Sequence, residues 1–505
     1  MLAENGILRS MNRIGFDNQK YVSMQSEHIR ERIAQFGDKL YLEFGGKLFD
    51  DNHAARVLPG FLPDAKVNML RELKNDVEII IAIHAGDIEQ NKTRGDLDIT
   101  YESEVLRLID SFTARELDVT GVVITRYGGQ PSADAFMQQL QNLGIRVYKH
   151  YPIPGYPVNV PLIVSDEGFG KNEYIETSKK LVVVTAPGPG SGKLAVCLSQ
   201  LYHEFKRGKK AGYAKFETFP IWNLPLTHPV NLAYEAATTD LDDVNMIDPF
   251  HLEAYGVTTV NYNRDVESFP VLNAIFERIQ GTSPYRSPTD MGVNMVGNSI
   301  IDDAVVQAAA KQEIIRRYYT ALCNAKRGKA NQEQVVFKSE LIMKKCGATP
   351  EDRPVVAAAL ARAEATGDPA VAIQLPDGKM ITGKTSQLLG PTAAALLNAL
   401  KELAGIQHEM DLISPIIIEP IQRLKTQHLG SKNPRLHSDE VLIALSICAA
   451  TNPTAALAIA QLPKLANCEA HSSVILGHVD RSTLRKLGIN FTMEPWYESN
   501  RLYHK

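Results

Sequence analysis

LVVVTAPGPGSGKLAVCLSQL, residues 181–201, is the stretch of this sequence that decides the fold. Its apolar, β-branched start predicts a buried strand at Leu181–Thr185. The glycines and prolines that follow predict a tight loop. Apolar residues then recur at helical spacing and predict a helix that begins at Lys193. Strand, loop and helix in this order form the basic unit of a parallel α/β sheet.

The same alternation extends through the first half of the chain. The predicted strands are Val77–Ile83, Val119–Thr125, Ile145–Tyr148 and Ala211–Glu217, and the predicted helices are Glu104–Phe112 and Ala133–Asn142. Continuous apolar strands separated by helices indicate a parallel sheet that is covered on both faces. Ligands of such sheets bind beyond the carboxyl ends of the strands, so loops such as Arg126–Gln130 are predicted to lie on the functional edge.

The alternation weakens after about Val271, and a different organisation follows. Ile301–Lys326 is predicted to be one long helix, followed by an exposed turn or linker at 326–334. Further helices are predicted at Val355–Ala365, Thr392–Ala404 and Ser438–Ala450, and strands at Ala370–Leu375 and Ser473–Leu476. We therefore predict an α/β region at 1–285 with a break near 175, a helical connection at 286–345, and a smaller α/β C-terminal domain at 346–505.

Composition excludes several classes of protein. The 505 residues carry a net charge of −4, so there is no excess of positive charge to bind nucleic acid. No apolar run is long enough to span a membrane, and the N-terminus lacks the pattern of a signal peptide. The five cysteines are odd in number and none are closely paired, which argues against a disulfide framework. We expect a cytoplasmic protein that binds neither nucleic acid nor membranes.

The loop that follows Thr185 has the features of a phosphate site. Such a site needs glycines that let backbone N–H groups turn inward, a helix N-terminus, and a lysine that reaches the outer phosphates. All three are present in the right order. The predicted phosphate-binding residues are Gly188, Gly190, Ser191, Gly192 and Lys193.

Two positions depart from the pattern G-x-x-x-x-G-K-[ST]. Pro187 holds the place of the first glycine, and Leu194 holds the place of the hydroxyl that normally binds Mg²⁺. The ligand is therefore either a nucleotide or another anion, and its dependence on Mg²⁺ is open. The alternative is a strand-to-helix turn with no ligand. Residues 181–217 resemble the amidoligase and dethiobiotin-synthase branch of P-loop proteins.

A carboxylate-rich segment at residues 238–253 supplies the candidate catalytic residues. Carboxylates can act as general bases or hold Mg²⁺ beside phosphates, and a histidine can transfer protons. The candidates are Asp240, Asp243, Asp248 and His251. The alternative is an acidic loop whose side chains cap helices. No metal ligand is assigned, because His251-Leu-Glu253 lacks the later P-C-x-x-C of a zinc deaminase.

Two further clusters supply candidate substrate-binding residues. Lys47 and Arg56 flank the turn at Gly45-Gly46 and can clamp an anion, unless the turn is a hairpin with surface charges. His84 and Asp87 follow directly after the predicted strand Val77–Ile83, which puts them at its carboxyl end. The segment 283–292 is polar and rich in proline, and is either a lid or a plain connection.

Five segments together resemble an uncharacterised bacterial family of unknown function. They are Glu43–Asp50, Ala186–Lys193, Ala214–Asn223, Asp248–Gly256 and Ser287–Asn294. The resemblance covers nearly the whole chain. It implies an α/β N-terminal region, a distinct C-terminal region, no established activity and no assigned catalytic residue. Some members carry the label "ATP-dependent peptidase", but the chain has neither H-E-x-x-H nor G-x-S-x-G, so peptidase activity is not expected.

The sequence thus predicts a protein that binds a small phosphate-bearing ligand, either a nucleotide or a phosphorylated metabolite. Its activity is predicted to be that of a transferase or ligase, and the alternative is a ligand-binding or scaffold protein without turnover. The long helix at 301–326 suggests a homodimer.

Overall fold

The structure is a computed structural model that describes residues 13–498 with the exception of residues 38, 96 and 98. The chain forms two compact units. The N-terminal unit comprises residues 14–234 and 243–307. Of the described residues, the C-terminal unit comprises 235–242 and 308–498, together with Arg13. The predicted helical connection, 286–345, contains the change from one unit to the other.

A seven-stranded sheet forms the centre of the N-terminal unit, and all its neighbouring strands are parallel. Its strands are, in spatial order, β11 (Gly292–Val293), β8 (Gly212–Phe216), β1 (Leu40–Phe44), β7 (Leu181–Thr185), β2 (Val77–His84), β5 (Asp118–Thr125) and β6 (Val147–Lys149). Every residue of β7 is buried, so both faces at the centre of the sheet are covered. The predicted parallel α/β region is confirmed.

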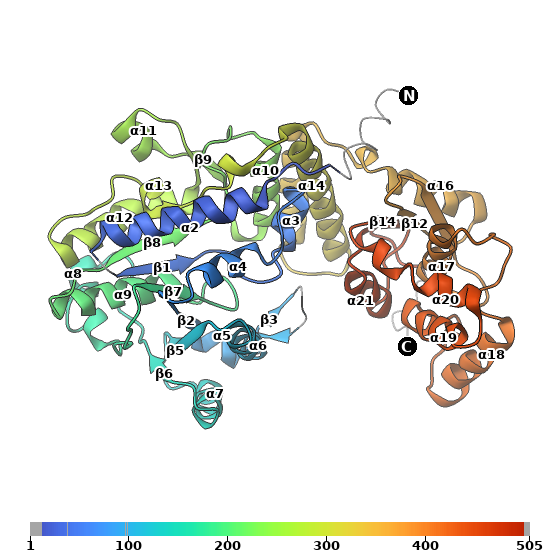
Figure 1. Cartoon of the computed structure of the whole chain (residues 1–505), viewed down its shortest axis with the longest axis horizontal. Coiled ribbons are helices and arrows are strands. Elements are labelled where there is room, and N and C mark those ends of the chain that lie inside the picture. Colours follow the sequence, from blue (N-terminus) through green and yellow to red (C-terminus); the bar gives the residue numbers. More distant parts are fainter. Residues whose placement is uncertain (1–12, 38, 96, 98, 499–505) are drawn as a thin grey trace. The chain divides into compact units, whose positions relative to one another are not determined.

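Helices pack around these strands (Figure 1). Apolar side chains of α8 (Val160–Ile163), α9 (Lys193–Lys206) and α12 (Asn263–Gln280) form one core with those of β1, β7 and β8. In addition, α2 (Asn18–Gln35) contacts β8, while α6 (Tyr101–Thr113) contacts β2 and β5. Burial of this apolar surface is the main stabilising contribution, at roughly 25 cal/mol per Å².

The smaller elements connect the strands. The helices are α3 (Asn52–Val57), α4 (Ala65–Glu72), α5 (Ala85–Glu89), α7 (Pro131–Asn142), α10 (Pro229–Ala237), α11 (Pro249–Tyr255) and α13 (Pro288–Met291), with 3₁₀ turns η1 (Phe169–Lys171) and η3 (Gly297–Ser299). Two short antiparallel ladders pair β3 (Thr93–Arg94) with β4 (Ile99–Thr100), and β9 (Asn245–Ile247) with β10 (Val260–Tyr262).

Because β7 lies between β1 and β2, the glycine-rich loop leaves the sheet at its centre. The loops that follow the other strands emerge at the same edge, since all strands run in one direction. We call this the carboxyl edge and the opposite one the amino edge. The segments at the carboxyl edge include 45–47, 85–87, 126–130, 186–192 and 217–220.

The C-terminal unit holds a smaller, mixed sheet in the order β13 (Met380–Lys384), β12 (Ala370–Gln374), β14 (Glu469–Ser472) and β15 (Asn490–Met493). Only β14 and β15 pair in parallel. Its helices are α14 (Asp303–Lys326), which begins in the N-terminal unit, α15 (Gln332–Cys346), α16 (Pro354–Thr366), α17 (Pro391–Ala404), α18 (Pro415–Arg423), α19 (Ser438–Ala449), α20 (Pro453–Ile459) and α21 (His478–Lys486). Single turns are η2 (Thr239–Leu241), η4 (Pro350–Asp352), the π-helical η5 (Leu424–His428) and η6 (Leu462–Leu465).

The strand predicted at Ser473–Leu476 is wrong, because the strand lies just before it, at Glu469–Ser472. The Ser472 hydroxyl donates to the carbonyl of Val474 at 2.8 Å, and this local bond turns the chain out of the sheet. Hydroxyl side chains that bond to nearby backbone favour turns over strands, which apolar patterning alone did not reveal.

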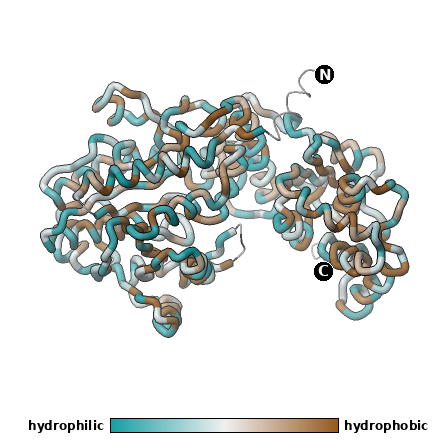
Figure 2. The backbone as a smooth tube through the Cα atoms, viewed as in Figure 1, coloured by the Kyte–Doolittle hydropathy of each residue, from teal (hydrophilic) through white to brown (hydrophobic). Residues whose placement is uncertain are grey.

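Within the described residues, no helix combines the length and the apolar character needed to cross a bilayer. Figure 2 shows hydrophilic positions interspersed along the helices of both units.

Candidate functional site

The glycine-rich loop after β7 is held tightly to the sheet. Gly190 and Gly192 have φ angles of 77° and 87°, a left-handed conformation that residues with a Cβ avoid. The buried Ser191 hydroxyl donates to the Gly188 carbonyl at 2.9 Å. The Thr125 hydroxyl, at the end of β5, donates to the Ser191 carbonyl at 2.7 Å. The Ser191 side chain therefore supports the loop from within.

The loop leads directly into α9, whose N-cap is Gly192 and which has no side-chain cap. In the described part of the chain, the backbone N–H groups of Gly190, Ser191 and Gly192 donate no hydrogen bond. A Cβ added at Gly190 would meet nothing within 4 Å, so the loop is open there. Unpaired N–H groups beside the positive end of a helix dipole favour a negatively charged partner.

Lys193 is the first residue of α9, and its side chain is partly buried. Burial lowers the pKa of Lys193, and the Glu43 carboxylate at the end of β1 acts in the opposite direction. Glu43 also favours the charged form of Lys215 on β8, which is its partner in the β1–β8 register. The Tyr213 hydroxyl donates to Glu43 at 2.8 Å. One carboxylate thus favours the charged form of two lysines, which come from α9 and β8.

A group of buried charges lies where β8 ends. The Lys215 ammonium is 2.8 Å from Glu217 Oε1, donates to the Tyr262 hydroxyl at 2.6 Å, and forms an ion pair with Asp265. The Tyr262 hydroxyl donates to Glu217 at 3.1 Å. We call these four residues the Lys215 cluster. Strand alternation puts Lys215 and Glu217 on one face, while Tyr262 and Asp265 come from β10 and the first turn of α12.

The Lys215 cluster sets unusual protonation equilibria. Burial alone would lower the pKa of Lys215, but Asp265 and Glu217 outweigh it and raise that pKa. Burial raises the pKa of Glu217 to about 7, assisted by Asp265 and opposed by Lys215. A carboxyl group with a pKa near the working pH can both donate and accept a proton, which is what general acid–base catalysis requires.

The raised pKa of Glu217 predicts a pH dependence of stability. The unfolded carboxyl titrates near 4.5 and the folded one near 7, so its contribution is complete below pH 4.5 and is lost as the pH rises through 7. At about 1.4 kcal/mol per pKa unit, the loss between pH 4.5 and 8 is about 3 kcal/mol. Glu217→Gln is expected to remove this loss from the free energy of unfolding of the N-terminal unit.

Denaturation by urea at pH 5 and pH 8 measures this effect. The chain has two tryptophans, and Trp222 lies in the N-terminal unit. A Trp496→Phe background therefore makes the fluorescence report on that unit. Glu267→Gln, which changes an exposed carboxylate on α12 outside the Lys215 cluster, is the matched control. Equal pH dependence in wild type and Glu217→Gln would contradict the assignment.

An aromatic wall lies beside the Lys215 cluster. The rings of Phe219 and Tyr234 stack with centroids 5.6 Å apart, and Tyr234 lies 6.3 Å from Tyr262. His53, from α3, packs edge-on against Phe219 at 5.5 Å. These rings exclude water from one side of the charges, which strengthens the electrostatic interactions there.

The four predicted catalytic residues lie in different environments. Asp243 is buried and pairs with Arg264 at 3.0 Å, and Arg264 acts electrostatically on Lys193. Asp248 is fully buried and caps α11, accepting the His251 N–H at 3.0 Å. It also accepts the hydroxyl of Thr289 at 2.6 Å.

His251 contacts the Ser287 hydroxyl through Nδ1 at 2.9 Å. Asp240 is exposed on η2, which belongs to the C-terminal unit. Of the four, Asp243 is thus the one that the structure brings into the electrostatic surroundings of Lys193.

Of the predicted substrate-binding residues, His84 and Asp87 lie at the carboxyl end of β2, where each has a local structural partner. His84 caps α5, because its Nδ1 accepts the N–H groups of Gly86 and Asp87 at 2.9 and 3.2 Å. Burial lowers the pKa of His84, in keeping with a neutral acceptor ring. Asp87 pairs with Lys92 at 3.2 Å.

The turn at Gly45-Gly46 leads toward α3 and is not part of a hairpin. Lys47, just after this turn, is exposed, and Arg56 on α3 is partly buried. Neither residue is part of the Lys215 cluster.

Sequence reasoning missed the Lys215 cluster and Glu43. One signal was available, since Lys215 and Glu217 occupy alternate positions at the end of the predicted strand Ala211–Glu217. Two charges on one face of an otherwise apolar strand indicate a special environment. Their partners, Tyr262 and Asp265, could not be found this way, because they are about 50 residues distant in the chain and meet β8 only in the fold.

Within the described residues, no group of three or more histidine, cysteine, aspartate or glutamate side chains is arranged to hold a metal ion.

Comparisons with known proteins cover nearly the whole chain. The model of the N-terminal domain of DUF1846, a domain of unknown function, matches residues 14–347. The model of the DUF1846 C-terminal domain matches residues 351–503. UPF0371 proteins of Streptococcus thermophilus (strain CNRZ 1066) and Streptococcus pyogenes serotype M5 are each 60% identical over 495 residues, which is 98% of this chain and 100% of each relative. None of these descriptions mentions a peptidase.

Proposed function

The chain belongs to the DUF1846 family, and we propose that it binds a nucleotide or a phosphorylated metabolite at the carboxyl edge and acts on it as a transferase or ligase. The observation that carries this proposal is the electrostatic link between the glycine-rich loop and the Lys215 cluster. The Glu43 carboxylate acts electrostatically on Lys193 at the start of α9 and on Lys215 in β8. The glycine-rich loop and the Lys215 cluster are therefore electrostatically coupled.

The two parts have complementary roles in the proposal. The N–H groups of 190–192 and the Lys193 ammonium hold a phosphate group. Lys215 favours the ionised form of Glu217, which then accepts a proton from an attacking hydroxyl or amine. Arg264, paired with Asp243, adds a further positive charge to the field at Lys193. Charge that develops on a transferred group would be stabilised by these fixed cations.

A thermal-shift screen tests the binding step. The probes are inorganic phosphate, ADP, ATP, GTP and a set of sugar phosphates, each with and without Mg²⁺. A ligand present at about 100 times its dissociation constant should stabilise the N-terminal unit by roughly 2.7 kcal/mol. If none of these compounds raises the melting temperature at millimolar concentration, the proposal is wrong.

A second experiment separates catalysis from binding. Once a ligand is found, Glu217→Gln is expected to retain its affinity but to slow turnover by about 100- to 10,000-fold, because proton transfer is lost. Glu267→Gln should behave as wild type. Unchanged turnover in Glu217→Gln would remove this residue from the mechanism.

One observation favours a second candidate function, a ligand sensor without turnover. Leu194 stands where a P-loop supplies the hydroxyl that binds Mg²⁺. A sensor would bind its ligand equally well in EDTA and release no product. Hydrolysis of a nucleoside triphosphate that is lost in Asp243→Asn would exclude it.

A further inference from the structure

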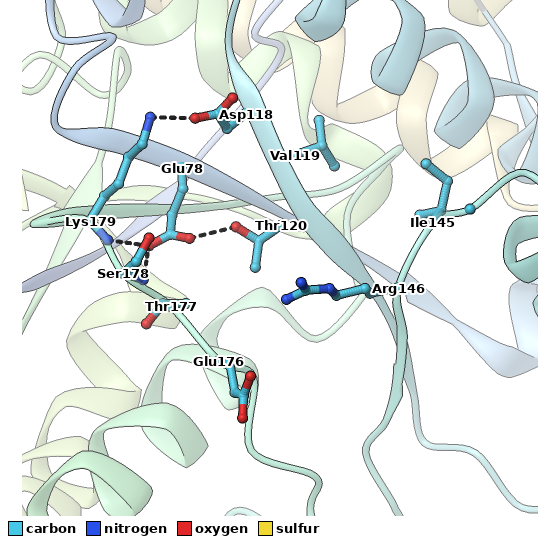
Figure 3. Close-up of a pocket in the computed structure, with 11 residues that line it drawn as sticks. Glu78, Asp118, Val119, Thr120, Ile145, Arg146, Glu176, Thr177, Ser178 and Lys179 are labelled. Carbon is cyan, nitrogen blue, oxygen red and sulfur yellow. Dashed lines mark hydrogen bonds and ion pairs between the residues drawn. The ribbon is translucent and has the colours of Figure 1, made fainter.

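The amino edge of the sheet carries a cavity of about 630 Å³ (Figure 3). It opens where β2 and β5 begin, and the segment 176–179 that precedes β7 forms its other side. The volume falls within the range of small-molecule sites, about 300–1,000 Å³. The cavity lies at the opposite end of the strands from the glycine-rich loop, so it is independent of the proposed function.

A buried carboxylate at the floor of the cavity joins its walls through hydrogen bonds. Glu78, 5% exposed, accepts the N–H groups of Ser178 at 2.7 Å and Lys179 at 2.6 Å. Its second oxygen accepts the Thr120 hydroxyl at 2.7 Å. The Glu78 side chain thereby connects β2, β5 and the segment that precedes β7. Bonds of this kind to an ionised group are stronger than neutral ones.

A β-bulge shapes the same place. The β2–β5 register shifts between Ile79 and Ile80, which leaves Thr120 as an extra residue in β5. The extra residue turns the Thr120 hydroxyl to Glu78. Bulges are over-represented beside functional sites because they redirect a side chain. Next to it, a Cβ at Gly121 would meet the carbonyl of Arg146 at 2.8 Å, so only glycine lets the cavity wall approach this closely.

The charges around the cavity do not all pair with one another. The Lys179 ammonium pairs with Asp118 at 2.5 Å, and the N–H groups already described balance Glu78. In the described part of the chain, the side chains of Arg146 and Glu176 form no ion pair or hydrogen bond. Figure 3 shows the Arg146 guanidinium directed from the β6 side toward the 176–179 segment. Both residues are exposed to solvent, so one cation and one anion without a partner among the described protein residues line the open side of the same cavity.

We propose that this cavity binds a free amino acid. Its carboxylate pairs with the Arg146 guanidinium, whose planar fork matches two carboxylate oxygens. Its ammonium group is attracted by Glu176. A zwitterion can contact both protein charges at once, whereas a ligand with a single charge can contact only one of them.

Calorimetry on the full chain tests this with the twenty amino acids as probes at pH 7.5. At least one amino acid is expected to bind. Arg146→Gln should weaken its affinity at least tenfold, and Glu176→Gln by a smaller factor. The matched controls are Arg30→Gln and Glu27→Gln, exposed charges on α2, which should change nothing. Circular dichroism checks that each variant is folded.

Analogues of the bound amino acid provide a test that does not depend on substitution. The deaminated acid and the decarboxylated amine should each bind at least tenfold more weakly. The absence of binding by all twenty amino acids at 10 mM would overturn the proposal. So would equal binding by Arg146→Gln, or equal affinity for the deaminated acid.

Discussion

Lys193→Ala is expected to weaken the binding of a phosphorylated ligand by about 10- to 100-fold, because a charge-assisted hydrogen bond contributes about 1.5–3 kcal/mol. The side chain lies at the first turn of α9, beside the unpaired N–H groups of 190–192. Its removal takes away a positive charge at the end of the loop and leaves the backbone donors in place. Isothermal titration calorimetry with the best ligand of the thermal-shift screen measures the effect.

Two comparisons make this result interpretable. Lys210→Ala removes an exposed lysine beyond the other end of α9 and should bind as wild type, which excludes a general effect of net charge. Lys193→Arg keeps the charge and should retain part of the affinity. Equal binding by wild type and Lys193→Ala would show that the ligand lies elsewhere. A salt titration should weaken the wild type more than the alanine variant.

Arg353→Met is expected to destabilise the C-terminal unit by about 3–5 kcal/mol, since removing one partner of a buried ion pair leaves the others unsatisfied. Arg353 is fully buried, and its guanidinium pairs with Glu469 at 2.5 Å. It also donates to the carbonyls of Ala470 at 3.1 Å and Asn490 at 3.0 Å. One side chain thus joins α16 to both β14 and β15.

Trp496 fluorescence in a Trp222→Phe background reports the unfolding of this unit by urea. Arg362→Met, an exposed arginine on the same helix α16, should cost less than about 0.5 kcal/mol, as is usual for surface substitutions. A loss below about 1 kcal/mol for Arg353→Met would mean that the network relaxes around the smaller side chain. The N-terminal unit should melt unchanged.

Local patterning predicted five strands of the N-terminal sheet, which correspond to β2, β5, β6, β7 and β8, but it did not predict β1 or β11. Val77–Ile83, Val119–Thr125 and Leu181–Thr185 are continuous apolar runs, and they correspond to β2, β5 and β7 to within one residue at each end. Strands that are buried on both faces show no alternation of polar and apolar residues, so a continuous apolar run is enough to predict them. The prediction of a strand at Ser473–Leu476 was wrong, because apolar patterning does not reveal a hydroxyl–backbone hydrogen bond such as the one that turns the chain at Ser472.

The candidate site divides in the same way. Gly190, Gly192 and Lys193 are close in sequence, and their spacing alone predicted a loop that leads into a helix. The predicted roles of Asp240, Asp248 and His251 depended on nearness in sequence, which does not imply nearness in space. The two carboxylate oxygens of Asp248 accept hydrogen bonds from the first turn of α11 and from Thr289. The pattern of charges in the sequence could not reveal this structural role.

By itself, the sequence determined that apolar strands alternate with helices and that the glycine-rich loop joins a strand to a helix, because both follow from interactions within a few residues. Only the tertiary structure decided that β1 lies between β7 and β8, which puts Glu43 in range of both Lys193 and Lys215. It also decided that Asp265 lies in range of Glu217, so that burial and Asp265 together raise the pKa of Glu217 to about 7, against the opposing effects of Lys215 and Tyr262. Strand order and helix packing depend on the burial of the whole apolar surface, so no short stretch of sequence specifies them.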